Sequence, residues 1–359
     1  MNHRLALFKY PGGKSKRVEL LLKYLGPHLT TASSFHEVFV GGGPLLLYVS
    51  SLFPHLSLFA NDLDPTVAAF WSVLADPDDG QFEELCAKLD IVPDIDIFNQ
   101  ERATSFDPTR SLIQKAFHCV FFHKTTFSGM YGASPIGGKN QTGDWKVGCH
   151  YTPSKFVPKI REARRRVLGR LTVSSVPTQE YLHGFDGQGA VVYADPPYYK
   201  AGPALYAVSM DDAQHRELES ALAGVTCPWV LSYDNHPVIR ELYKSYRICE
   251  EPFRYSSASF RKEKTWTEKV ELIILPKEVV MSTESTVPAV PTPVKRNRVG
   301  RPRKVKLSPL EELRIRLKSL IERKTVLKAE LEAAEADILT LTEEYRVGRD
   351  KEDAFLNAV

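Results

Sequence analysis

Short apolar runs alternate with longer stretches of helical periodicity along the first 275 residues of the chain. Four runs have the length and composition of buried strands, at residues 35–40, 190–194, 229–231 and 270–275. Helical patterns lie between them, for example at 16–25 and 210–222. Because buried strands that alternate with helices form open, mainly parallel sheets, we expect an α/β fold.

The pattern changes after Lys277. Residues 278–309 are rich in Pro, Ser, Thr and Val, which predicts an extended linker. From 310 to 345, apolar residues recur at alternating spacings of three and four over five heptads, which predicts a coiled-coil helix. Such a helix either pairs with a second chain or folds back onto the first 275 residues.

Composition excludes several classes of protein. With 359 residues, 43% hydrophobic and 25% charged, the chain exceeds one average domain and has an ordinary globular composition. No apolar run approaches the roughly 18 residues that cross a bilayer, and the start lacks a signal peptide's apolar segment. We therefore expect a cytoplasmic protein with no membrane partner. The five cysteines form no Cys-x-x-Cys pair, so neither a disulfide framework nor a metal site is expected.

The net charge of +3 conceals a basic segment. Residues 295–306 contain seven Lys and Arg and no acid, and without them the chain would carry −4. The segment contains a Gly-Arg-Pro core that resembles an AT-hook, in which Arg301 and Arg303 would enter the narrow minor groove of A·T-rich DNA. A generic basic linker that binds phosphates anywhere is the alternative.

A glycine-rich turn, residues 41–43, follows the first predicted strand. Glycines between a strand and a helix let a ligand approach the backbone closely. A dinucleotide fingerprint needs a further glycine where this chain has Leu46, so a pyrophosphate site is disfavoured. Asp62, about twenty residues on, follows the next strand at a position suited to ribose hydroxyls. Adenosine without a diphosphate fits these features, although Asp62 alternatively caps a helix that begins near Pro65.

The second motif, Asp195-Pro196-Pro197-Tyr198, directly follows the predicted strand 190–194. Two prolines fix the backbone and remove two donors, so the loop is rigid and its carbonyls can accept hydrogen bonds. A carboxylate, carbonyls and an aromatic face at the carboxyl end of a buried strand suit a planar base that carries an amino group. A simple turn would explain the prolines but not their pairing with an acid and a tyrosine.

Four motifs, in this order, resemble those of Dam-type (D12 class) DNA adenine N6-methyltransferases. They occupy residues 9–14, 37–43, 61–62 and 195–198, and the resemblance extends over about residues 5–275. It implies an open Rossmann-like methyltransferase sheet with S-adenosyl-L-methionine as the methyl donor. The positions that match the family's donor pocket are Tyr10, Lys14, Glu37, Phe39, Gly41, Gly43 and Asp62. For the Asp-Phe pair that addresses the donor's adenine in the family, the nearest match here is Glu180-Tyr181.

The resemblance and the composition together divide the chain. We expect a donor-binding part at 1–64, a mainly helical target-recognition insert at 65–170 and a catalytic part at 171–277. The basic linker with the AT-hook-like motif follows at 278–309, then the coiled coil at 310–347 and a tail at 348–359.

In the family, target recognition lies between the ribose acid and the catalytic strand. Here that region carries aromatic, basic and amide side chains on glycine-rich loops, which are types that contact bases and phosphates. The candidates for nucleic-acid contacts are Lys124, Tyr131, Lys139, Asn140 and Gln141. A run of arginines, Arg161, Arg164, Arg165 and Arg166, either contacts phosphates or forms a solvated basic helix face.

The resemblance implies site-specific methyl transfer to N6 of an adenine flipped out of double-stranded DNA. Asp195 and the Pro196 carbonyl would accept hydrogen bonds from N6 and free its lone pair, and Tyr198 would stack on the base. Two alternatives are methylation of cytosine N4 and a DNA-binding architectural protein with a vestigial methyltransferase domain. An Asp rather than a Ser before Pro-Pro-Tyr favours adenine by family resemblance. Neither the recognition sequence nor an endonuclease partner, as in restriction-modification, follows from one chain.

Charges that flank the apolar positions of the predicted coiled coil favour one orientation. They are basic early, at Arg314, Arg316, Arg323 and Lys328, and acidic late, at Glu330, Glu335, Asp337 and Glu344. In a parallel pair Arg323 would face Lys328, whereas in an antiparallel pair it faces Glu330. We therefore predict an antiparallel homodimer through residues 310–345.

Overall fold

The computed structural model describes residues 7, 8, 10, 12–185, 187–199, 209–255 and 267–277. The chain separates into two compact units, Met1–Ala289 and Val290–Val359, and all described residues belong to the first. The predicted basic linker, with Arg301 and Arg303, and the predicted coiled coil lie outside the described residues.

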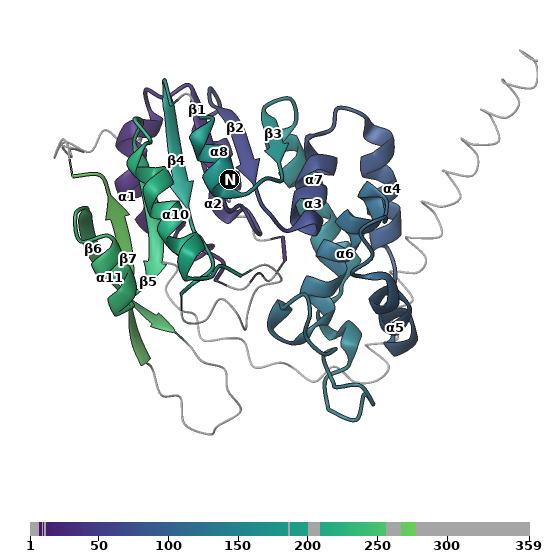
Figure 1. Ribbon diagram of the computed structural model, residues 1–359. Coiled ribbons are helices and arrows are strands. Elements are labelled where there is room, and N and C mark those ends of the chain that lie inside the picture. The colour runs from purple at the N-terminus through teal and green to yellow at the C-terminus, as the bar shows by residue number, and fades with distance from the viewer. Residues whose placement is uncertain are drawn as a thin grey trace, which may run out of the picture. The chain divides into compact units, whose positions relative to one another are not determined.

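A seven-stranded sheet forms the centre of the first unit, with the strand order β3-β2-β1-β4-β5-β7-β6 (Figure 1). The strands are β1 (Ser34–Glu37), β2 (Ser57–Asn61), β3 (Leu171–Ser174), β4 (Ala190–Ala194), β5 (Trp229–Asp234), β6 (Arg247–Tyr255) and β7 (Thr267–Leu275). Strands β1 to β5 pair in parallel, whereas β7 is antiparallel to both β5 and β6. The predicted α/β fold is confirmed. The order reverses between β1 and β4, and open α/β sheets bind ligands outside the carboxyl ends of strands at such a switch point.

Helices cover both faces of the sheet because successive residues of a strand point to opposite sides. On β4, Val191 and Tyr193 belong to one apolar cluster, and Val192 and Ala194 belong to another. The first cluster includes residues of α1 (Val18–Leu29), α2 (Pro44–Leu52) and α3 (Pro65–Ala75). The second includes residues of α8 (Thr178–His183), α10 (Asp212–Ala223) and α11 (Pro237–Leu242).

The chain between β2 and β3, which is described throughout, contributes helices rather than strands to the fold. After α3 these are α4 (Asp79–Leu89), α5 (Ile95–Thr104), α6 (Leu112–Thr125) and α7 (Pro153–Val167), with 3-10 turns η1 (Phe127–Gly129) and η2 (Val147–His150). Helices α3 to α7 group together beside the β3 edge of the sheet (Figure 1). Helix α6 carries the fully buried rings of Phe117, Phe121 and Phe122, so it forms part of the core of this group.

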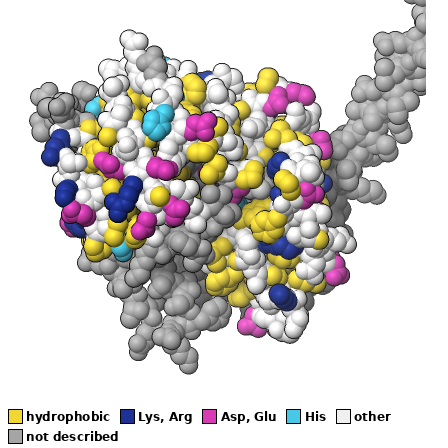
Figure 2. All heavy atoms as spheres, in the orientation of Figure 1, with side chains coloured by type: hydrophobic (Ala, Val, Ile, Leu, Met, Phe, Trp, Pro, Cys, Tyr) yellow, Lys and Arg dark blue, Asp and Glu magenta, His cyan; other side chains and the backbone are white. Residues whose placement is uncertain are grey.

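The surface of the unit carries both signs of charge. Figure 2 shows acidic and basic side chains interspersed over the face that includes α10. Among the described residues, no helix combines the length and the apolar character needed to cross a membrane.

Candidate active site

The glycine-rich turn after β1 crosses the carboxyl end of the sheet. Gly41 and Gly43 have positive φ angles of 47° and 58°, and Gly43 is the N-cap of α2. A Cβ on Gly43 would lie 2.2 Å from the ring of Trp71. The Nε1 of Trp71 donates a hydrogen bond of 2.9 Å to the carbonyl of Gly41. Glycine at position 43 is therefore required both by the backbone conformation and by the close approach of the indole.

Two carboxylates beside this turn, the buried Glu37 and the partly buried Asp62, have different partners. Glu37 accepts a hydrogen bond of 2.7 Å from the backbone N–H of Leu46, so its side chain caps α2. Asp62 accepts hydrogen bonds from the backbone N–H groups of Gly41 at 2.8 Å and Asp64 at 3.0 Å. The N-cap of α3 is Asp64, so the alternative in which Asp62 caps that helix is wrong.

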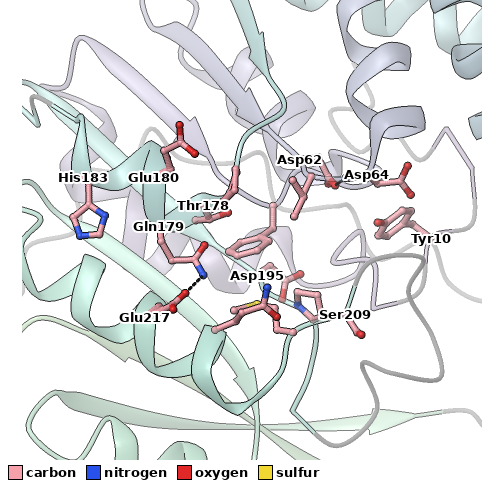
Figure 3. Close-up of a pocket in the computed structure, with 16 residues that line it drawn as sticks. Tyr10, Asp62, Asp64, Thr178, Gln179, Glu180, His183, Asp195, Ser209 and Glu217 are labelled. Carbon is pink, nitrogen blue, oxygen red and sulfur yellow. Dashed lines mark hydrogen bonds between the residues drawn. The ribbon is translucent and has the colours of Figure 1, made fainter. Parts of the chain in front are cut away.

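A cavity of about 530 Å³, the acidic cavity, opens beside the carboxyl ends of β1, β2 and β4 (Figure 3). Its lining includes the predicted residues Tyr10, Phe39, Asp62, Glu180, Asp195 and Pro197. It also includes residues that were not predicted, among them Thr178, Gln179, Met210, Gln214 and Glu217. Its lining holds the carboxylates of Asp62, Asp64, Glu180, Asp195 and Glu217 and, among the described residues, neither Lys nor Arg. The cavity therefore favours a cationic ligand.

A second cavity of about 850 Å³, the basic cavity, has the opposite charge. Its lining contains six basic side chains, Lys14, Lys16, Arg17, Lys124, Lys155 and Lys159, and one described acid, Glu271. Tyr10 lines both cavities, while Asp195 lines the acidic one and Tyr198 the basic one. The loop after β4 therefore contributes to both cavities.

The carboxylate of Asp195 is held by two side chains at this loop. The Nζ of Lys14 lies 2.6 Å from both oxygens of Asp195, and the hydroxyl of Ser232 donates to Oδ1 at 2.9 Å. Lys14 also donates to the Tyr198 hydroxyl at 3.0 Å. Burial alone would lower the pKa of Lys14, but the charge of Asp195 and other nearby groups raises it well above its usual value. Lys14 is therefore a buried ammonium ion paired with Asp195.

A model of the family of D12 class N6 adenine-specific DNA methyltransferases matches residues 10–256. That range includes the glycine-rich turn, Asp62 and the loop after β4, and it makes up more than half of the chain. The chain belongs to this family. It is therefore an adenine-specific DNA methyltransferase, and its family implies S-adenosylmethionine as the methyl donor. None of the curated proteins matches the sequence.

Several solved structures are similar to the methyltransferase over much of its length. One from Thermoplasma acidophilum shares 9% identity with a TM-score of 0.35, and the match covers 74% of this chain and 90% of that one. A precorrin-6y C5,15-methyltransferase from Geobacter metallireducens shares 10% identity with a TM-score of 0.30, over 70% and 87% of the two chains. A SAM-dependent O-methyltransferase from Thermotoga maritima shares 10% identity with a TM-score of 0.31, over 73% and 64%.

Tyr10 of the methyltransferase is supported by the helical group. Its ring stacks on the imidazole of His123, with centroids 5.0 Å apart and an interplanar angle of 24°. His123 is a buried residue of α6, and its Nδ1 lies 2.6 Å from the carbonyl of Cys119. Helix α6 therefore fixes an aromatic side chain that both cavities share.

The structure separates the pair Glu180-Tyr181. Glu180 lines the acidic cavity, at the opposite side from Tyr10 and Asp62 in Figure 3. The hydroxyl of Tyr181 lies 2.7 Å from the Nδ1 of His36, and its ring packs against the apolar cluster under α8. Of the two residues, only Glu180 is in a position to contact a ligand in that cavity.

The predicted nucleic-acid contacts fall into different environments. Lys124 lines the basic cavity with its Nζ 4.3 Å from the ring centroid of Phe156, and burial together with Lys159 lowers its pKa to about 8. Tyr131 is only 5% exposed and donates to the carbonyl of Ser105 at 2.9 Å, so it belongs to the core.

The remaining candidates lie on the loop between η1 and η2. Lys139 and Asn140 are exposed. The side-chain amide of Gln141 bonds to the backbone of Ile136, Gly138 and Val147, so it shapes the loop.

The four arginines of α7 are paired within the helical group. Arg161 bonds to Glu83, and Arg164 bonds to Asp79 at 2.7 Å. Both Arg165 and Arg166 pair with Glu162, at 2.8 and 2.9 Å. The run is therefore a set of ion-paired arginines, and the side chains of Arg164 and Arg166, 5% and 10% exposed, do not belong to the solvated face that was the alternative. Among the described residues, no cluster of His, Cys, Asp and Glu is arranged to hold a metal ion.

Sequence reasoning missed two residues that contact the loop after β4, Ser232 and Glu271. Tyr198 donates a hydrogen bond of 2.7 Å to Glu271, which is 4% exposed. One signal was available, because Glu271 is the single acid within the apolar run 270–275. An acid in a buried strand needs a partner.

Proposed function

We propose that the methyltransferase transfers a methyl group from S-adenosyl-L-methionine to N6 of an adenine flipped out of double-stranded DNA. The observation that supports this most is the position of the Asp195-Pro196-Pro197-Tyr198 loop, which lines an acidic cavity and a basic cavity. A sulfonium donor is cationic and DNA is a polyanion, so the two cavities suit the two substrates. The reaction would take place where the cavities share this loop.

The residues of the acidic cavity fit the donor. Its volume of about 530 Å³ is in the range of small-molecule sites. Asp62 accepts one backbone N–H on each oxygen, and each oxygen has a second lone pair available to a ribose hydroxyl. The ring of Phe39 forms an apolar wall of the cavity. The carboxylate of Glu180 can accept hydrogen bonds from the adenine or the ribose of the donor. When bound, S-adenosylmethionine supplies a methyl group on a positively charged sulfur.

The chain's own residues prepare the amino group of the target. The lone pair of an adenine N6 is delocalised into the ring, which makes it a poor nucleophile. Asp195 and the Pro196 carbonyl accept hydrogen bonds from N6, localise the lone pair and stabilise the positive charge that develops on nitrogen. Tyr198 stacks on the base, and Pro197 keeps the loop rigid. Flipping the base costs a few kcal/mol, which DNA contacts in the basic cavity offset.

Donor affinity is expected to depend on pH through Asp62. Burial and the neighbouring Asp64 raise the pKa of Asp62 to about 7. Above that pH the carboxylate accepts hydrogen bonds from ribose hydroxyls, and below it the protonated acid loses acceptor capacity. The Kd for the donor should therefore increase as the pH falls below about 7, by at most about tenfold per unit. Calorimetric titrations of wild type and Asp62→Asn check this, since the variant should bind weakly at every pH. Equal pH dependence in both proteins would contradict the assignment.

Phe127 is expected to contact DNA in place of the buried Tyr131. It is 64% exposed in η1, next to Ser128, whose φ is 57°. An exposed aromatic ring on a loop suits stacking on a base, which contributes about 1–3 kcal/mol. Phe127→Ala should therefore weaken DNA binding roughly 5- to 150-fold at constant salt, with unchanged donor affinity. The matched control is Phe106→Ala, because Phe106 is 67% exposed but packs against Tyr131. Equal losses in both variants would contradict a specific role for Phe127.

The predicted C-terminal region adds two proposals that rest on sequence alone. Arg301 and Arg303 would anchor the linker in A·T-rich minor grooves, and residues 310–345 would form an antiparallel homodimer. A minor-groove ligand should displace a 290–308 peptide from A·T-rich duplex, and indifference to base composition would indicate a generic basic linker.

Sedimentation of the full-length protein should give a dimer, and a monomer would indicate a helix folded back on its own chain. Ready disulfide formation between Ser308→Cys chains would mean a parallel pair.

The test of the proposed function is transfer of labelled methyl from S-adenosylmethionine to duplex DNA. We expect N6-methyladenine at one sequence, which long-read mapping of DNA from expressing cells identifies. N4-methylcytosine as the product would overturn the proposal that adenine is the substrate. DNA binding without any methylation would favour the architectural alternative.

A further inference from the structure

Glu271 holds together a cluster of charges beside the loop after β4. It lies on β7, the strand that runs antiparallel to β5. Its Oε1 accepts the hydrogen bond of 2.7 Å from Tyr198 and lies 3.4 Å from the Nζ of Lys14, while Oε2 lies 3.0 Å from Arg17. A single buried carboxylate therefore contacts three side chains, two of which belong to the segment that precedes α1.

Lys14 is shared between two carboxylates. Its ammonium lies 2.6 Å from Asp195 and 3.4 Å from Glu271, and its side chain is 5% exposed. A buried charge is tolerated only when it is paired, so the two cations Lys14 and Arg17 and the two anions form a balanced set. If either Asp195 or Glu271 lost its charge, the ammonium group of Lys14 would move toward the carboxylate that remains.

The same contacts leave little acceptor capacity on Asp195. A carboxylate offers about four lone-pair sites. Lys14 uses one on each oxygen, and Ser232 uses the second on Oδ1. One acceptor site therefore stays available on Oδ2, which matches one N–H of an amino group.

We propose that Glu271 is a positioning residue for methyl transfer: through Tyr198 it fixes the ring that faces the target base, and through Lys14 it keeps one acceptor site of Asp195 directed to the amino group. This inference rests on the function proposed above for the loop. Glu271 itself lines only the basic cavity and acts through its two partners. Its loss therefore affects the transfer step rather than the binding of the donor.

Single-turnover transfer separates this role from a structural one. Glu271→Gln keeps the shape of the side chain and removes its charge, and we expect the transfer rate to fall about 10- to 100-fold with the donor Kd unchanged. Tyr198→Phe removes the hydroxyl that donates to Glu271 and accepts from Lys14, so it breaks the contact with Glu271 while Lys14 keeps both carboxylates as partners. The double variant should be no slower than the slower single variant, because both changes break one arrangement. Additive losses, a wild-type rate for Glu271→Gln or an equal loss of donor affinity would overturn the proposal.

A pH profile gives a second readout. The titratable groups that face Asp195 are Lys14, Glu37, Tyr193, Tyr198, Tyr233 and Glu271. Burial raises the pKa of Asp195, Lys14 opposes this, and Glu271 adds to it. The transfer rate should therefore increase with pH as Asp195 ionises, and Glu271→Gln, which leaves Lys14 paired with Asp195 alone, should move the midpoint of that increase to lower pH. An unchanged midpoint would show that Glu271 does not act on Asp195.

The ratio of each variant's transfer rate to the wild-type rate does not depend on which base is methylated. If the wild type methylates another acceptor, the substrate proposal fails while the comparison between variants still tests Glu271.

Discussion

Asp195→Asn is expected to lower the rate of methyl transfer by about two to three orders of magnitude, the loss typical for one preorganised polar group at a transition state. The amide keeps the shape of the carboxylate, so it can still accept hydrogen bonds from Lys14 and Ser232 through one oxygen. It lacks the negative charge that stabilises the developing cation on N6. Single-turnover transfer to duplex DNA measures the loss.

The control for this prediction is Ser232→Ala. That change removes the 2.9 Å hydrogen bond to Oδ1 and leaves the charge of Asp195 and its contact with Lys14 in place. Its effect on the rate should be roughly tenfold or less, because the hydrogen bond from Ser232 is made in the ground state and the transition state alike and the charge of Asp195 is kept. Thermal unfolding of both variants shows whether the fold is kept. Wild-type turnover in Asp195→Asn would show that Asp195 does not act in methyl transfer.

The sequence predicted the elements whose side chains are buried on both faces or on one regular stripe. Strand β4 has the limits that the apolar run 190–194 predicted, because all five of its side chains are buried. Helix α10 was predicted at 210–222 and extends from Asp212 to Ala223, where Asp211 forms a capping box. Helix α2 begins at Pro44, directly after the glycine-rich turn, as predicted.

The apolar pattern did not predict the strands, or the strand ends, at which buried and exposed side chains are mixed. The edge strand β3 buries only Leu171 fully, and β2 begins with an exposed serine. Strand β1 ends at Glu37 instead of Val40, because the chain turns at residues 38 and 39, although the N–H groups of Val38 and Val40 still bond to β4 and β2 and both side chains are buried. A short strand whose apolar residues are few carries no period that distinguishes it from a loop.

The motifs predicted loops that line the acidic cavity but not the partners of those loops. Asp62, Phe39 and Asp195 line one cavity, as a shared site requires. Lys14 was assigned to the donor through the family resemblance, whereas its ammonium lies on Asp195 beside the basic cavity. Glu271 contacts Tyr198 across a sequence separation of 73 residues. Pairing between such distant segments depends on the position of β7 beside β5, which no local pattern specifies.

Gly43→Ala is expected to lower the free energy of unfolding by about 2–5 kcal/mol. Two costs combine, because the residue has a φ of 58° and its new Cβ would lie 2.2 Å from the ring of Trp71. Gly138→Ala separates them, since Gly138 has a φ of 75° and a Cβ there would meet no heavy atom within 4 Å. The control should lose only about 1–2 kcal/mol, which is the cost of the left-handed conformation. Urea unfolding measures both values. Equal losses would show that the Trp71 ring moves aside with no cost in the free energy of unfolding.

The indole contact can be tested further by combining Gly43→Ala with Trp71→Phe. The smaller ring removes the atoms that the new methyl group meets, but it also removes the hydrogen bond from Nε1 to the Gly41 carbonyl. Each single change should therefore destabilise the protein, and the double change should cost less than their sum. Because Asp62 bonds to the N–H of Gly41, a displaced turn also displaces Asp62, the acceptor proposed for the ribose hydroxyls. Donor affinity should consequently fall in Gly43→Ala and stay unchanged in Gly138→Ala. Full additivity of the unfolding energies would mean that the methyl group and the indole do not meet.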